Sequence, residues 1–415
     1  MSDARSGLRF MVNDDNFFVS MRNLWSDYRT HLGAVSDFNV VSLYELHGSV
    51  RAEAKRSVGR YDVLAIDNPW LGEFVTDGLL RPLDDLIADS SVEAGAFNTD
   101  VWSTGNWKGR QYGIPIYTTI EVLAARTDLF SQAGITYPRT FDQTVEAAAR
   151  LHRPARDVYG IGWNCAPGLP IASTFMILLG CCGAPLLRYP LGRRGYQWSE
   201  LEGDQFRPNI LSDQARIVLD YMHRLIPYSP PNILELDWNG RLGAFMAGRL
   251  AMTYCWSMRA ARFEYDIASQ VKRKVTYLTQ PKGPGGVSAN PIGGFHLTIP
   301  CNVGDAKARL AFEAIAWLAQ SDERRGSGFP VAPRFSTAAD PEVAQSTHVF
   351  TFAETLAKRG MVCASQRPAI PEYTRIEAIL GDRIHAAMRG EITDDEALIQ
   401  SQNRVDALMR AAGRY

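Results

Sequence analysis

The chain has 415 residues, which is too long for one ordinary hydrophobic core and favours two or three domains. Hydrophobic residues make up 46% and charged residues 21%, and these near-average values argue against a disordered, collagen-like or membrane-embedded chain. The formal net charge is -1 and the runs of Lys and Arg are short, so we expect no nucleic-acid partner.

Location is the least determined property of the sequence. Residues 1–7 show neither the apolar stretch nor the cleavage site of a signal peptide. The six cysteines have no C-x-x-C spacing, and most lie in apolar runs, so we expect buried thiols, although three disulfides are possible by number. Many free thiols favour a reducing compartment, which leaves the cytoplasm open as the location.

The first part of the chain alternates strands and helices. We predict strands at 8–12, 38–43 and 61–66, with a helix carrying apolar positions from Phe17 to Tyr28 and a second at 45–58. This alternation is typical of a parallel sheet covered by helices on both faces. Polar clusters follow the first and third strands, at the carboxyl ends where open α/β sheets bind ligands.

A second α/β unit begins at about Asp128. Capping residues are expected at Thr140, Ser212 and Thr393, each opening a helix. The further predicted elements are a strand at 159–163, a core helix at 173–179, a helical segment at 242–246, strands at 250–256 and 295–299, and a helix at 308–320.

Catalytic and metal-binding signatures are absent from the sequence. The seven histidines include no i, i+4 pair, and there is no H-E-x-x-H motif, Cys/His zinc set, phosphate-binding loop or G-x-S-x-G elbow. We therefore predict no catalytic residue, no metal and no cofactor, and expect a binding protein. These absences weaken the enzyme alternative without excluding it.

Five separated segments carry a resemblance to a known family. They are Tyr61-Asp62-Val63 with Gly78 to Asp84, Trp107 to Pro115 running on to Ile135, Gly243 to Met252, Pro291 to Phe295, and Arg367-Pro368 through Thr393. In this order and spacing they resemble the family 1 extracellular solute-binding proteins, the maltose-binding-like group that serves ABC importers. The resemblance implies a type II periplasmic-binding-protein fold, with two α/β lobes that close a hinge around the ligand.

The resemblance also implies a division of the chain. The N-terminal lobe would comprise residues 1–122 with about 291–330, and the C-terminal lobe residues 123–290 with about 331–415. It further implies a monomer in the periplasm that delivers its ligand to an ABC permease.

The candidate ligand contacts combine aromatic faces for sugar C–H surfaces with amide, carboxylate or Arg groups for hydroxyls. Asp14 and Asn16 follow from the strand-end argument alone. The resemblance and the strand ends together point to the remaining candidates, which are Asp67, Asn68, Trp70, Tyr117, Glu121, Trp163, Asn164, Trp256, Ser257, Gly293, Gly294, Phe295 and Arg334.

Several candidates have a structural alternative. Trp70 fits a turn, Glu121 a hinge salt bridge, Trp163 core packing, and the two glycines a tight turn before a strand. Trp238 is a weaker candidate that fits packing under the following helix. Trp25, Trp102, Trp198 and Trp317 are assigned to packing.

The predicted function is binding of a small carbohydrate or sugar derivative between the lobes, with delivery to an ABC permease. An anionic sugar, a sulfonated sugar or an opine-like ligand remains open, with Arg188, Arg193 or Arg334 as the cation. The alternatives are an intracellular ligand-sensing module of the same fold and a carbohydrate-active enzyme.

Overall fold

A computed structural model describes residues 7–14, 18, 37–190, 198–320 and 347–415. The strands are β1 (Arg9–Asn13), β2 (Asp37–Val41), β3 (Val63–Asp67), β4 (Asn106–Trp107), β5 (Arg110–Gln111), β6 (Gly113–Arg126), β7 (Tyr159–Gly162), β8 (Leu250–Trp256), β9 (Val275–Leu278), β10 (Asn290–Thr298) and β11 (Val362–Cys363).

The helices of the N-terminal half are α3 (Leu43–Ala54), α4 (Leu71–Thr76), α5 (Asp84–Ala88) and α6 (Thr99–Ser103), with a 3-10 turn, η1 (Asn68–Trp70), before α4. The later helices are α7 (Thr127–Ala133), α8 (Phe141–Leu151), α9 (Leu169–Cys181), α10 (Asp213–Leu225), α11 (Trp238–Met246), α12 (Ser257–Ala260), α13 (Arg262–Tyr265), α14 (Asp305–Gln320), α16 (His348–Lys358), α17 (Tyr373–Met388) and α18 (Asp394–Ala411).

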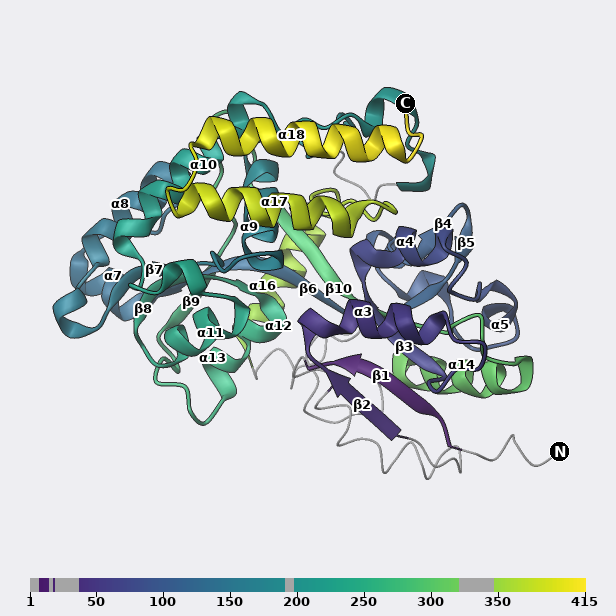
Figure 1. Ribbon diagram of the computed structural model, residues 1–415. Helices are drawn as coiled ribbons and strands as arrows, with labels where there is room; N and C mark the ends of the chain where they lie inside the picture. The colour runs from purple at the N-terminus through teal and green to yellow at the C-terminus, as the bar shows by residue number, and fades with distance from the viewer. Residues whose placement is uncertain (1–6, 15–17, 19–36, 191–197, 321–346) are drawn as a thin grey trace.

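Nine of the described strands form one sheet that runs through two lobes, in the order β2-β1-β3-β10-β6-β8-β7, with β9 on β6 and β11 on β10. β4 and β5 pair only with each other. The first lobe holds β1 to β3 with α3, α4 and α14, and the second holds β7 to β9 with α7 to α13 (Figure 1). β6 and β10 run between them (Figure 1). The two-lobe α/β fold is confirmed.

The parallel pairing predicted for the first three strands is confirmed, and an antiparallel strand, β10, extends the sheet. β1 pairs in parallel with β2 and β3, as expected for strands joined by helices. β10 lies antiparallel to both β3 and β6. The reason is that β10 enters from the second lobe, so no βαβ connection fixes its direction.

The long strand β6 passes through both lobes, and all of its residues are buried. It pairs with β10 as far as Ile120 and with β8 from Glu121 onward. The predicted lobe boundary at residues 122 and 123 lies beside this change of partner, and the division into lobes stays a prediction. The strand was not expected, because burial on both faces removes the alternation that marks a strand.

The predicted N-terminal caps of three helices are confirmed. The hydroxyls of Thr140 and Ser212 accept from the amides of Gln143 and Ala215 at 3.3 Å. Thr393 and Glu396 form the reciprocal capping box at the start of α18. The predicted strand at 250–256 has the observed bounds, whereas β10 begins at Asn290, before the expected Phe295. Apart from Phe18, the predicted helix from Phe17 to Tyr28 lies outside the described residues.

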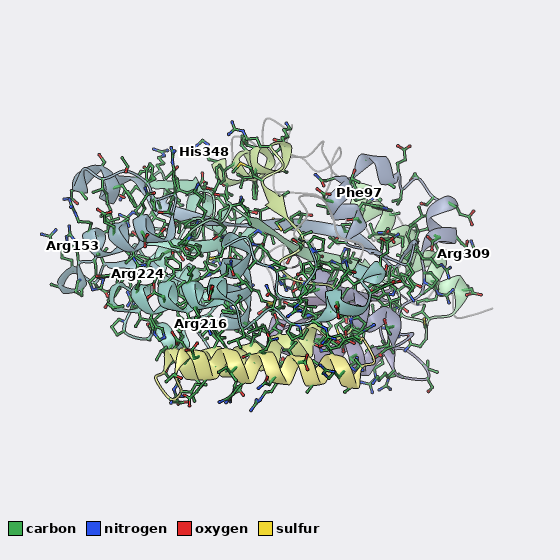
Figure 2. The ribbon with its side chains drawn as sticks, turned by 90° about the horizontal axis from the view of Figure 1, so that it is seen from above. Phe97, Arg153, Arg216, Arg224, Arg309 and His348 are labelled. Carbon is green, nitrogen blue, oxygen red and sulfur yellow. The ribbon has the colours of Figure 1, made fainter. Side chains whose placement is uncertain are left out.

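Two long helices, α17 and α18, lie over the lobes (Figure 1). α17 packs along α9 of the second lobe, and its Thr374 hydroxyl donates to Glu73 of α4 in the first lobe at 2.8 Å. Arg216 of α10 ties α18 to the second lobe through Asp395, at 2.8 Å (Figure 2). α17 therefore contacts both lobes. Within the described part of the chain, no helix is long and apolar enough to cross a membrane.

All six cysteines are free thiols, and four of them are buried. The expectation of buried thiols is therefore right for these four and wrong for Cys301, which is exposed. Burial raises the pKa of Cys165 and of Cys182 to about 12, so these two thiols stay protonated and unreactive.

Candidate ligand cleft

A cleft between the lobes is lined by residues from every part of the fold. Its lining consists of Asn13, Leu43, Asp67, Tyr117, Thr119, Leu169, Ser173, Trp238, Trp256, Met258, Arg259, Gly293, Gly294, Phe295, Arg367 and Glu377. The open volume is about 60 Å³, which is room for about two waters at about 30 Å³ each. The cleft thus combines aromatic, amide, hydroxyl and charged groups in a small space.

A larger hollow, of about 1490 Å³, opens on the second lobe and is lined by residues such as Tyr137, Lys282 and Cys363. None of the residues predicted to contact ligand lines it. We assign the ligand site to the smaller cleft, because both lobes contribute to it and it contains buried polar groups.

The first-lobe wall is built from the ends of two neighbouring parallel strands, β1 and β3. Asn13 and Asp67 are the last residues of these strands, and parallel strands bring their carboxyl ends to one edge. Asn13 is buried, and its Oδ1 has no hydrogen-bond partner among the described residues. Asp14 is exposed and does not line the cleft, and Asn16 lies outside the described residues.

Arg367 forms a largely buried ion pair with Asp67 of the first-lobe wall. Its guanidinium donates to both carboxylate oxygens of Asp67, with Nη1 at 3.4 Å from Oδ1, and its Nε donates to the Tyr373 hydroxyl at 3.1 Å. The Tyr373 hydroxyl donates in turn to Oε1 of Glu377 at 2.8 Å. The charge of Arg367 is thus already matched by Asp67, so this guanidinium does not require an anionic ligand.

Glu377 is buried on α17, and this burial raises the pKa of its carboxyl to about 7, with Arg367 and Tyr373 opposing the rise. The folded protein therefore holds a proton that the unfolded chain releases near the ordinary glutamate pKa of 4.5. A raised pKa of this kind gives stability that is present below pH 4.5 and is lost as the pH rises through 7.

We expect Glu377→Gln to remove that loss. Relative to wild type, the free energy of unfolding of the variant should rise by up to about 3 kcal/mol between pH 4.5 and pH 8, at about 1.4 kcal/mol per pH unit. Urea denaturation across this range measures the difference, with Glu313→Gln on the exposed face of α14 as the matched control. Parallel profiles for wild type and Glu377→Gln would contradict the buried protonated carboxyl.

Aromatic side chains form the second-lobe wall. Trp256 ends β8, and Trp238 begins α11; both are buried, and they cluster with Ile177. A Cβ on Gly293 would lie 2.9 Å from the Trp256 ring, so the glycine lets the indole lie against β10. Ser257, next along the chain, accepts from the Ile120 amide at 3.1 Å and so holds the end of β8 to the crossing strand.

Gly294 has a φ of 144°, and a Cβ there would lie 2.3 Å from the Tyr117 carbonyl oxygen. We expect Gly294→Ala to lower the free energy of unfolding by about 1–3 kcal/mol or more, because both the backbone conformation and the space exclude a side chain. Thermal and urea unfolding measure this. Gly243→Ala in α11 is the control, because nothing lies within 4 Å of its added methyl group and alanine favours a helix. Equal effects of the two substitutions would show that the backbone conformation at position 294 does not require glycine.

Other predicted residues lie outside the cleft lining. Trp70 is buried with its ring centroid 6.4 Å from that of Phe295, and Asn68 stands beside it in η1. Trp163 is buried, and its Nε1 donates to the Ser229 hydroxyl at 3.0 Å. Arg334 lies outside the described residues.

Two further polar candidates are buried and do not line the cleft. Glu121 is in a buried ion pair with Arg241 of α11, the arrangement expected of a structural salt bridge at the hinge. Asn164 is also buried, and its side-chain Oδ1 has no partner among the described residues. The structure thus brings six of the predicted residues to the cleft, namely Asp67, Tyr117, Trp256, Gly293, Gly294 and Phe295.

Sequence reasoning missed several lining residues. Asn13 belongs to the polar cluster after the first strand, and Arg367 to a segment that carried the resemblance, so both had a signal. Glu377 lies in the same segment, but it was not singled out because its helix was not predicted. The described residues contain no group of three or more side chains suited to a metal ion.

The fold and the cleft define a two-lobe α/β binding protein. The chain belongs to the family of bacterial extracellular solute-binding proteins, whose pattern matches residues 41–324. It is 25% identical over 375 residues to the mannitol-binding protein of Pseudomonas aeruginosa, covering 86% of this chain and 82% of that protein.

Solved structures show the same fold. A solute-binding protein from Agrobacterium radiobacter in complex with ribitol has a TM-score of 0.87 and 24% identity, covering 97% of this chain and 98% of that one. Another from Agrobacterium vitis with bound D-mannitol has a TM-score of 0.85 and 22% identity, covering 98% and 99%.

Proposed function

We propose that this chain binds a small neutral polyol or monosaccharide in the cleft between its lobes and releases it unchanged to an ABC permease. The observation that carries the proposal is the cleft itself. It sets two tryptophans of one lobe opposite the unpartnered amide oxygen of Asn13 and the paired charges of Asp67 and Arg367. Indole faces suit C–H surfaces, and the polar groups suit hydroxyls.

The size and charge of the cleft support a small neutral ligand. Its volume corresponds to about two waters, which suits one sugar unit better than an oligosaccharide. Arg367 is already paired with Asp67, which favours a neutral ligand over the sugar acids and sulfonated sugars. A relative named as a mannitol-binding protein and a similar structure solved in complex with ribitol support the same ligand class.

Membership of the family supports transport without chemistry. Its members are solute-binding proteins, so we infer action outside the cytoplasmic membrane, as a monomer that docks an ABC permease. The ligand would be recovered chemically unchanged after incubation, which separates the proposal from a carbohydrate-active enzyme.

A thermal-shift panel of alditols, monosaccharides, disaccharides and sugar acids tests the ligand class. A ligand at 100 times its Kd stabilises the folded protein by about 2.7 kcal/mol, which gives a clear rise in Tm. We expect the largest shifts with alditols or monosaccharides. Shifts confined to disaccharides or to sugar acids would contradict the proposal.

A further inference from the structure

The first turn of α3 reaches across the cleft to the second lobe. The Tyr44 hydroxyl donates to Oδ2 of Asp237 at 2.8 Å, across a chain separation of 193 residues. Asp237 immediately precedes α11. Figure 1 shows α3 beginning beside α11 and α12, on the opposite side of the gap between the lobes.

Apolar contacts surround this hydrogen bond. Leu43 packs with Leu169 against the cluster of Ile177, Trp238 and Trp256, and the Tyr44 ring centroid lies 6.1 Å from that of Trp238. Tyr44 itself is 47% exposed, and neither it nor Asp237 lines the cleft. The contact therefore lies at the rim and joins the lobes without occupying the ligand space.

The Asp237 carboxylate is fixed before it meets Tyr44. Its Oδ1 accepts from the amides of Asn239 and Gly240 at 3.0 Å and 2.8 Å, as the N-cap of α11. Oδ2 remains available to accept the hydrogen bond from the Tyr44 hydroxyl. Burial and the neighbouring carboxylate raise the pKa of Tyr44 above its usual value, so the hydroxyl keeps its proton and remains a donor.

We propose that Tyr44 and Asp237 form a clasp between the lobes that stabilises the closed form and slows release of the ligand. This inference rests on the proposed function. The clasp is a positioning device, since its residues act on closure and leave the ligand contacts to others. Loss of the clasp lowers the population of the closed form. The apparent affinity then falls by the same factor for every ligand.

Two single substitutions and their combination test the clasp. Tyr44→Phe removes only the hydroxyl, and Asp237→Ser keeps an N-cap side chain that is too short to reach Tyr44. In stopped-flow measurements, we expect D-mannitol or ribitol to dissociate from each single variant about 3–10 times faster than from wild type. The association rate constant should change less than twofold. The double variant should match the single variants, because both remove one interaction. Tyr137→Phe, an exposed tyrosine on the second lobe, is the control.

A ligand-independent readout separates this inference from the proposed function. Fluorescent labels on non-natural residues at Arg153 and Arg309, at opposite ends of the molecule (Figure 2), report the distance between the lobes. We expect Tyr44→Phe to shift the distance distribution to longer values. If wild type binds no polyol or sugar, the proposed function fails while this shift still tests the clasp. The clasp would be contradicted if Tyr44→Phe had the same lobe distances and the same dissociation rate as wild type. Additive effects in the double variant would also contradict it.

Discussion

Replacing Arg367 with methionine is expected to lower the free energy of unfolding by about 3–5 kcal/mol and to abolish measurable ligand binding. The substitution leaves Asp67 buried without its bidentate partner and removes the donor to Tyr373. Removing one member of a buried ion pair costs this much because the remaining charge stays desolvated. Urea denaturation and calorimetric titration measure the two effects.

Two controls make the result specific. Arg309→Met removes a partner of Asp89 at the far edge of the first lobe, where both side chains are more than half exposed, and should cost less than about 1 kcal/mol (Figure 2). Adding Asp67→Asn to Arg367→Met should restore part of the stability, because the unpaired charge is removed. An Arg367→Met variant as stable as Arg309→Met would contradict the role assigned to the pair.

Trp256→Ala should weaken ligand binding by about 30- to 100-fold, equivalent to about 2–3 kcal/mol. The indole is the largest apolar face that the end of β8 contributes to the cleft, and Gly293 leaves room for it. Trp256→Phe keeps an aromatic face and should lose less than tenfold. Calorimetric titration gives the dissociation constants.

Trp102→Ala is the matched control, since Trp102 packs against Phe97 with ring centroids 4.9 Å apart and lies outside the cleft lining. It should lower Tm yet leave the dissociation constant within about twofold of wild type. Unchanged affinity in Trp256→Ala, with folding verified by circular dichroism, would remove the indole from the proposed site.

The two tryptophans at the ends of neighbouring strands show where sequence reasoning stops. Trp163 follows β7 and Trp256 ends β8, and these strands pair in parallel. The sequence therefore predicts a ligand contact for both side chains. Trp256 lines the cleft, whereas Trp163 lies in the core, with its Nε1 bonded to Ser229 near the end of α10. Only tertiary packing distinguishes them.

Strand ends set a similar limit. The polar cluster after the first strand was recognised, but the predicted strand ended one residue early, and successive side chains of a strand point to opposite faces. Asn13 consequently lines the cleft in place of Asp14. The caps at Thr140, Ser212 and Thr393 were predictable because they depend on residues within one turn of helix.

The charged part of the cleft depends on distant segments. Asp67 and Arg367 are 300 residues apart in the chain, and Glu377 lies on a helix that was not predicted. Glu121 was predicted either as a ligand contact or as a hinge salt bridge, and its partner Arg241 is 120 residues away. No local pattern brings such partners together.

Calorimetric titration of the wild-type chain with D-mannitol and ribitol, followed by recovery of the ligand, tests most directly whether the protein is a polyol or sugar receptor without catalytic activity. We predict saturable binding of one ligand per chain and recovery of the ligand unchanged after long incubation. Absence of binding heat for every alditol and monosaccharide tried, or recovery of a chemically altered product, would contradict this function.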